Sequence, residues 1–198
     1  MIKEAAEFSV GLFTDKYPGV SNYLDIENSA YIKKEGGQTI YLQKDNYFDP
    51  LIEKIEMSAL DIARKYYQII DGYQPEVVSM WLNTHTKNNV HPPHNHQNTF
   101  LSGVFYLSES PKIASIGFLR PYAIPFLPII KEYNKYNTTV IKHVPSKDDV
   151  IFFPSYVYHY VDLNTEDKPR MSIAFDIILR GEYGEITKNN GTVGQFKI

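Results

Sequence analysis

Three histidines stand close together near the middle of the chain, in the segment HPPHNH at residues 91–96. Imidazole nitrogens bind iron, zinc and copper, so such a cluster predicts a metal site. His94 and His96 are two residues apart and would point to the same face of an extended strand, where both rings can reach one ion. His91 precedes two prolines, and we expect it on the loop leading into that strand, beside the site or at the surface. A polar loop of solvated imidazoles would have the same composition.

A metal site needs a further ligand from elsewhere in the chain, and His159 is the candidate. It lies in a predicted strand at residues 156–161, between two tyrosines. Because side chains alternate along a strand, His159 faces away from the tyrosines that flank it. A core histidine held by one hydrogen bond would show the same pattern. The sequence assigns no role to His85 or His143.

Arg170 begins the apolar segment RMSIAFDII, which predicts a strand. Alternation puts Arg170, Ser172 and Asp176 on one face of that strand. A guanidinium inside a barrel is costly unless it meets an anion, and its planar fork suits a carboxylate, to which a serine hydroxyl could also donate. The alternative is an arginine at the surface, or one in an ion pair with Asp149 or Glu166.

Tyr106 lies near the end of a predicted strand at residues 100–107. From there its hydroxyl could reach the same interior and donate to the same carboxylate. The alternative is an ordinary core tyrosine. Trp81, Phe105 and Tyr158 are candidates for lining the pocket, or for plain core packing.

One helix and eight strands are predicted to position these residues. Apolar residues recur at helical spacing over residues 50–70, from a first-turn proline to an Asp-Gly stop. Residues 14–47 are predicted mainly as loops, and residues 181–198 as a tail or an edge strand. Short apolar segments between Pro, Gly, Asn and Asp predict strands at residues 8–13, 77–85, 100–107, 113–119, 138–144, 150–153, 156–161 and 170–179.

The order of these elements predicts a fold class. A helix followed by many short strands indicates a mainly β (α+β) chain with a sandwich or barrel core and one packed N-terminal helix. The 198 residues, 43% of them hydrophobic, suit a single domain.

Composition limits the function. The chain has no cysteine, which excludes thiol nucleophiles, disulfides and zinc–thiolate sites. Its net charge of −3 argues against a nucleic-acid partner. We see no signal peptide and no membrane-spanning segment, and we expect a cytoplasmic protein.

The order His-x-His, SGVFYL, FFPS…H and R-x-S resembles the iron(II)/2-oxoglutarate-dependent oxygenase superfamily. More narrowly, HPPHNHQNTFLSGVFYLSES and FFPSYVYHYVDLNTEDKPRMSIAFDI resemble a group of bacterial and phage oxygenases, and the resemblance runs from about Trp81 to about Ile178. It implies a double-stranded β-helix (jelly roll, cupin-like) with its core at about residues 77–180. It also implies Fe(II), 2-oxoglutarate and O2 as cofactor and co-substrates.

The resemblance also implies a role for each site residue. His94 and His159 would be metal ligands, and Arg170, assisted by Ser172 and Tyr106, would bind the far carboxylate of 2-oxoglutarate. His96 stands where the superfamily has Asp or Glu, so the ligands would be three histidines in place of two histidines and one carboxylate.

The expected function is that of a dioxygenase that hydroxylates an unidentified substrate, a small molecule or a protein side chain, and releases succinate and CO2. Two alternatives remain. One is a cupin-like three-histidine metal enzyme that does not use 2-oxoglutarate, and the other is a non-catalytic jelly-roll binding module. A homodimer is also an open possibility.

Overall fold

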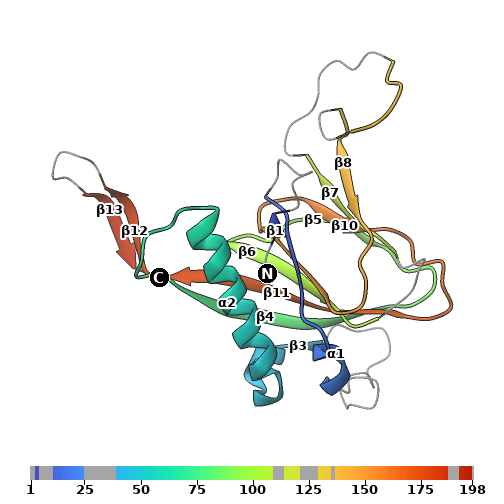
Figure 1. Cartoon of the computed structure of the whole chain (residues 1–198), viewed down its shortest axis with the longest axis horizontal. Coiled ribbons are helices and arrows are strands. Elements are labelled where there is room, and N and C mark those ends of the chain that lie inside the picture. Colours follow the sequence, from blue (N-terminus) through green and yellow to red (C-terminus); the bar gives the residue numbers. More distant parts are fainter. Residues whose placement is uncertain are drawn as a thin grey trace.

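The chain forms two main β-sheets with one long helix packed beside them (Figure 1). In this computed structural model the described residues are 3–4, 11–24, 39–108, 114–120, 129–134, 137–186 and 192–197. Among the described helices, none combines the length and apolar character that a membrane-spanning segment requires.

The larger sheet has seven antiparallel strands in the spatial order β1-β2-β9-β6-β11-β4-β3. The long strand β11 pairs with β4 on one side and with β6 on the other, so it runs through the interior of the sheet. The strands are β1 (Lys3–Glu4), β2 (Phe13–Lys16), β3 (Thr39–Ile40), β4 (Gln74–His85), β6 (Leu101–Tyr106), β9 (Asp149–Pro154) and β11 (Arg170–Arg180).

The smaller sheet has four antiparallel strands in the order β5-β10-β7-β8. A separate hairpin extends beyond the end of β11, away from β7 and β8 (Figure 1). The small-sheet strands are β5 (His91–His94), β7 (Ile116–Leu119), β8 (Val140–His143) and β10 (His159–Val161), and the hairpin strands are β12 (Glu182–Ile186) and β13 (Thr192–Lys197).

Successive strands alternate between the two sheets. From β4 to β7 the chain changes sheet at every step, and from β9 to β11 it does so again. This alternation winds the chain as a double-stranded β-helix, which confirms the predicted fold class. Most predicted strands are observed within a few residues of their expected bounds. The first one falls at β2 instead of residues 8–13, of which residues 8–10 lie outside the described part.

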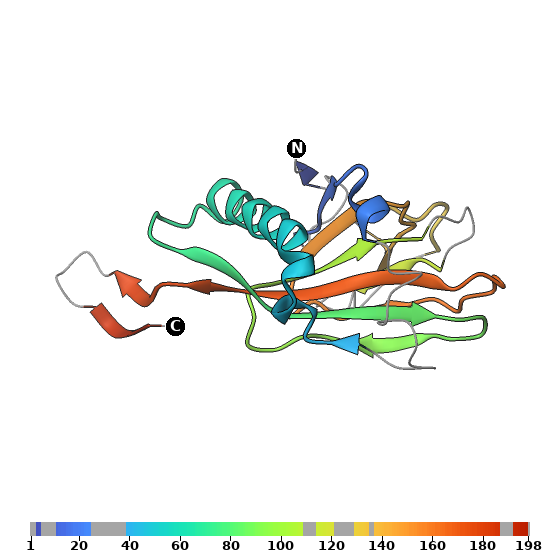
Figure 2. The ribbon, with the colours of Figure 1, turned by 90° about the horizontal axis from the view of Figure 1, so that it is seen from below.

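The helix α2 (Asp49–Lys65) lies across one face of the larger sheet (Figure 2). It follows three short helical turns: α1 (Val20–Tyr23), η1 (Leu42–Lys44) and η2 (Asn46–Phe48). Its predicted start is confirmed, but its predicted end at residue 70 is wrong. Gln68 takes a left-handed conformation (φ 51°), and the Ile69 amide donates to the Ala63 carbonyl at 3.0 Å. This closing turn ends the helix before the apolar spacing does.

The two faces of the larger sheet pack against different partners. Phe175 of β11 belongs to a buried cluster with Ile55 and the rest of the apolar stripe of α2. The next residue back, Ala174, belongs to a second cluster with Phe118 of the smaller sheet. The helix and the smaller sheet therefore cover opposite faces of the larger one.

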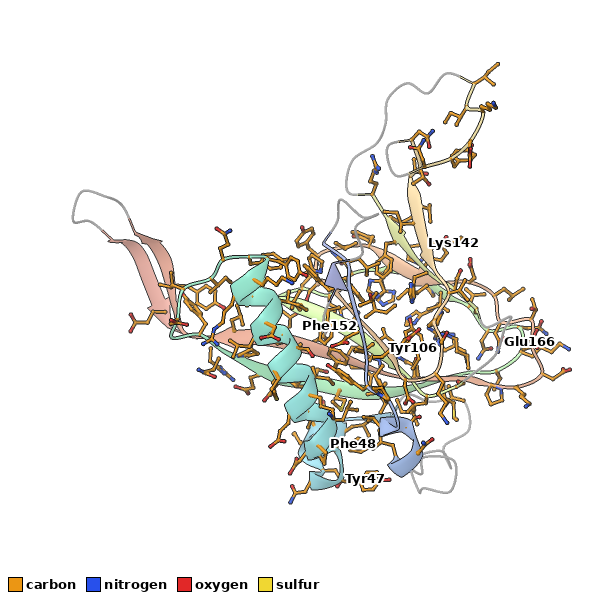
Figure 3. All side chains as sticks on the ribbon, viewed as in Figure 1. Tyr47, Phe48, Tyr106, Lys142, Phe152 and Glu166 are labelled. Atoms are coloured by element: carbon orange, nitrogen blue, oxygen red, sulfur yellow. The ribbon has the colours of Figure 1, made fainter. Side chains whose placement is uncertain are left out.

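Packing explains why residue 103, in the SGVFYL segment, is a glycine. A Cβ at this position would lie 2.3 Å from the Phe175 ring and 2.5 Å from the Ile151 carbonyl oxygen, closer than atoms can approach. Because glycine has no Cβ, the Phe175 ring has room there and packs edge-on against Phe152, with 5.4 Å between the ring centroids. Phe152 and Tyr106, on opposite faces, both lie inside the body of the molecule (Figure 3).

Candidate metal centre

Two paired strands of the smaller sheet bring His94 and His159 together. His159 opens β10 and stands directly opposite His94 in the antiparallel pair with β5. The β5 strand contains both prolines of the HPPH segment, which is tolerated because β5 is the edge strand of its sheet. The prediction that His91 sits on a loop is therefore wrong, since it is the first residue of β5 and its ring stacks on His94 at 4.2 Å.

His96 reaches the same place without belonging to the strand. The strand ends at His94, so the predicted same-face geometry of an extended His-x-His pair does not apply. Instead, the His96 amide donates to the Ser155 carbonyl at 2.9 Å, and its ring stacks on Trp81 at 5.5 Å between centroids. These contacts fix the backbone and the ring of His96 beside the strand pair.

The three histidines form a compact set of potential metal ligands. One ligand nitrogen from each of His94, His96 and His159 lies within 4.8 Å of the others. Each Nδ1 has an oxygen partner: the Pro92 carbonyl at 2.9 Å for His94, the Val157 carbonyl at 3.0 Å for His159, and Asp176 Oδ1 at 2.6 Å for His96. A carbonyl can only accept, so Nδ1 carries the proton in His94 and His159, and their Nε2 lone pairs are free for a metal.

Burial keeps His94 and His159 neutral. It lowers the pKa of His159 to about 3, against an opposing backbone hydrogen bond, and it also lowers the pKa of His94. A neutral imidazole is the form that binds a metal ion, because a protonated ring has no free lone pair.

Arg170 lies buried on the floor of the same pocket. It is 3% exposed, and within the described residues it forms no ion pair and its Nε has no hydrogen-bond partner. Of the two acids considered as its partners, Asp149 instead faces Lys16 at 3.2 Å, and Glu166 forms no described ion pair. A buried guanidinium without a counterion is costly, so the site favours an anionic ligand.

Two hydroxyls beside Arg170 are also without partners in the described structure. Tyr106 and Ser172 stand opposite each other on neighbouring strands, and both hydroxyls are buried and unpaired. The Arg170 guanidinium lies 5.0 Å from the centre of the Tyr106 ring. Burial raises the pKa of Tyr106 to about 12, although the nearby positive charge opposes this, so the hydroxyl remains a proton donor. Three donors thus converge where a carboxylate could bind.

One pocket connects the histidines with Arg170 and Ser172, whereas Tyr106 is not among its lining residues. Its empty volume, counted out to open solvent, is about 420 Å³. Trp81 lines it as expected, whereas Phe105 packs in the helix-side cluster and Tyr158 is half exposed outside it. The lining residues are Trp81, Asn83, His85, His91, His94, His96, Gly103, Val104, Ile116, Phe153, His159, Val161, Arg170, Ser172 and Ala174.

Two further histidines line the pocket, and one does not. His85 stands opposite Arg170 in the β4–β11 pair and has an unpartnered Nδ1, and burial lowers its pKa to about 4. Burial likewise lowers the pKa of His91 to about 4. His143 lies on β8, outside the three-histidine set.

Sequence reasoning missed the contact partner of His96. Asp176 accepts from His96, and it also accepts from the Ser102 hydroxyl at 2.6 Å. The available signal was its position on the same strand face as Arg170 and Ser172, where an acid would otherwise be expensive to bury.

The residues present fit an iron(II) centre with a dianionic co-substrate. Three imidazoles supply nitrogen ligands that suit iron, and they carry no negative charge of their own. The buried guanidinium, which has no described counterion, and the hydroxyls of Tyr106 and Ser172 supply donors for a carboxylate, which matches the chemistry of 2-oxoglutarate.

The sequence matches a protein family over residues 79–176, a range that holds every one of these site residues. The family is described as "Putative 2OG-Fe(II) oxygenase". The chain belongs to the iron(II)/2-oxoglutarate-dependent oxygenase superfamily. Enzymes of this superfamily are oxidoreductases that use iron and 2-oxoglutarate. No curated protein sequence matches the chain.

Solved structures of the superfamily share the fold at low sequence identity. SnoK, a non-heme alpha-ketoglutarate-dependent carbocyclase from nogalamycin biosynthesis, is 14% identical, with a TM-score of 0.64 over 90% of this chain and 86% of its own. HygX from Streptomyces hygroscopicus, solved with nickel and 2-oxoglutarate, is 12% identical, with a TM-score of 0.57 over 85% and 82%. A prolyl-4-hydroxylase from Pseudomonas putida is 13% identical, with a TM-score of 0.55 over 87% and 90%.

Proposed function

We propose that this oxygenase holds Fe(II) through His94, His96 and His159 and binds the far carboxylate of 2-oxoglutarate through Arg170, Ser172 and Tyr106. When bound, iron and 2-oxoglutarate supply the oxidation of a substrate by O2, with release of succinate and CO2. The observation that carries the proposal is the buried Arg170, which has no described counterion and an Nε without a hydrogen-bond partner, in the same pocket as the three-histidine set.

Different residues would bind the metal and the co-substrate. The three histidines offer nitrogen lone pairs to the metal, while Arg170, in the same pocket, orients the co-substrate by a forked pair of hydrogen bonds. Tyr106 stays protonated and donates, as its raised pKa requires. Apolar side chains from both sheets, such as Ile116 and Phe153, also line the pocket and exclude water from it.

The test is turnover of labelled 2-oxoglutarate by the purified protein with Fe(II), ascorbate and O2. We expect succinate and CO2 from the parent, and for Arg170→Ala an increase of about 100-fold in the 2-oxoglutarate concentration that gives half-maximal turnover. Arg170→Lys should fall between the two, because it keeps the charge and loses the fork.

Arg180→Ala is the matched control. Arg180 lies at the other end of β11, where it is exposed and paired with Glu76. Its replacement should leave turnover unchanged. Equal use of 2-oxoglutarate by Arg170→Ala and Arg180→Ala would contradict the proposal.

The all-histidine ligand set also favours a second candidate, a three-histidine dioxygenase that does not use 2-oxoglutarate. Iron-dependent O2 consumption without 2-oxoglutarate, unaffected by Arg170→Ala, would support that candidate instead. The unpaired guanidinium argues for the first one, because without an anionic ligand it has no described counterion.

We also propose a cytoplasmic location, a small molecule or a protein side chain as the substrate, and no nucleic-acid partner. The absence of cysteine is consistent with a reducing compartment, and the net charge of −3 argues against a phosphate-binding surface. The homodimer remains a prediction that the oligomeric state in solution would test.

A further inference from the structure

The three candidate ligands differ in the hydrogen-bond partners of their Nδ1 atoms. His94 and His159 donate to backbone carbonyls, which are neutral. His96 alone contacts a side-chain acid, Asp176, at 2.6 Å. His96 is also the residue that stands where the superfamily has a carboxylate ligand. His96, which replaces the carboxylate ligand of the superfamily, is therefore the candidate ligand whose ring contacts a carboxylate, that of Asp176.

We propose that Asp176 is a positioning residue that holds the His96 ring toward the metal and supplies, through that ring, the negative charge that a carboxylate ligand would bring. This rests on the proposed iron site. A carboxylate behind a ligand histidine fixes its tautomer and makes the ring more electron-rich, which strengthens its bond to the metal. The site would thus keep the negative charge that the carboxylate of the two-histidine, one-carboxylate set provides, but on Asp176, which contacts a ligand and not the ion.

The surroundings of Asp176 suit this role. The imidazole of His96 and the carboxylate of Asp176 are each 13% exposed, so solvent screens their contact little. Within the described residues Asp176 forms no ion pair with Lys or Arg, so its charge is not taken up by another cation.

A network of residues from β6, from β11 and from the turn after β9 holds the pair in place. The Ser102 hydroxyl donates to Asp176 at 2.6 Å, and a 3.0 Å hydrogen bond joins it to the Ser155 hydroxyl. The Ser155 carbonyl in turn accepts the His96 amide at 2.9 Å. The ring of His96 and its backbone are therefore tied to one network, with Trp81 stacked on the ring.

The test measures metal affinity with Fe(II) or Co(II) alone, by anaerobic competition with a coloured chelator. Asp176→Asn keeps the shape and an acceptor oxygen but removes the charge, and we expect the metal to bind about 10- to 100-fold more weakly. Unfolding of the apo-protein, followed in parallel, should show the variant folded. Metal affinity equal to the parent's in both Asp176→Asn and Asp176→Ala would overturn the proposal.

A double variant separates the charge from mere structural support. In His96→Asp the anion becomes a direct ligand, and Asp176 then lies beside a like charge. Adding Asp176→Asn to that background should strengthen metal binding, the opposite of its effect in the parent. The same weakening in both backgrounds would overturn the charge role.

Failure of this inference differs from failure of the iron site. If His94→Ala and His159→Ala lose the metal while His96→Ala and Asp176→Asn bind it like the parent, only the role of the His96–Asp176 pair is wrong. If none of the histidine variants changes metal binding, the proposed site itself is wrong.

Discussion

The two faces of the larger sheet carry different kinds of side chain, although they share the same strands. Toward α2, β11 presents Ile173, Phe175 and Ile177 to a continuous apolar cluster. Toward the smaller sheet, the same strand presents Arg170 and Ser172 to the pocket, followed by Ala174. The face toward α2 is filled by apolar side chains, whereas the face toward the smaller sheet carries hydrogen-bond donors without described partners. The larger apolar cluster therefore lies on the helix side, whereas the other face combines a smaller apolar cluster with the binding pocket.

This comparison predicts the largest stability loss on the helix side. Phe175 is fully buried against Phe152, so Phe175→Ala should leave a cavity and cost about 3–5 kcal/mol of unfolding free energy in urea. Metal affinity, measured where the variant is folded, should be unchanged. A loss of metal affinity without a loss of stability would break the comparison.

The pocket side should instead show a dependence on pH. Burial lowers the pKa of His85 to about 4, whereas in the unfolded chain it is near 6.5. The unfolded state therefore takes up the proton first, and the apo-protein should lose stability as the pH falls from about 6.5 to 4.

His85→Gln should flatten this dependence by up to about 1.4 kcal/mol per pH unit, measured by urea unfolding at several pH values. His85 is 8% exposed, so little of the effect is lost to solvent. Identical pH profiles for parent and variant would show that His85 is not held neutral by the fold.

The smallest stability effect is expected at Ser172. Its hydroxyl is buried without a described partner, so Ser172→Ala should change the unfolding free energy by less than about 1 kcal/mol. The same change should weaken 2-oxoglutarate binding about 10-fold, as read by its half-saturating concentration in turnover. A large loss of stability with unchanged co-substrate binding would place Ser172 in the core instead.

The sequence predicts the alternation of β11 well, because one strand with a period of two leaves only two faces to assign. It also predicts that His94, His159 and Arg170 share a cavity, since the motif order matches a known family. These predictions depend on local pattern and on resemblance, and both are readable without coordinates.

Other features depend on contacts between distant residues. His96 enters the site from beyond the end of β5, held by Ser155, and nothing in the local pattern indicates this. The end of α2 depends on a left-handed Gln68, a residue with no special turn preference. The role of Asp176 needs its distance from His96, which alternation alone cannot give.

The most direct test is an anaerobic titration of the apo-protein with Fe(II) and then with 2-oxoglutarate, followed by the charge-transfer absorption of the chelate. We expect one iron and one 2-oxoglutarate per chain. His159→Ala should lose both, and His143→Ala, which alters a histidine outside the set, should keep both. Stoichiometric iron and 2-oxoglutarate binding by His159→Ala would contradict the account.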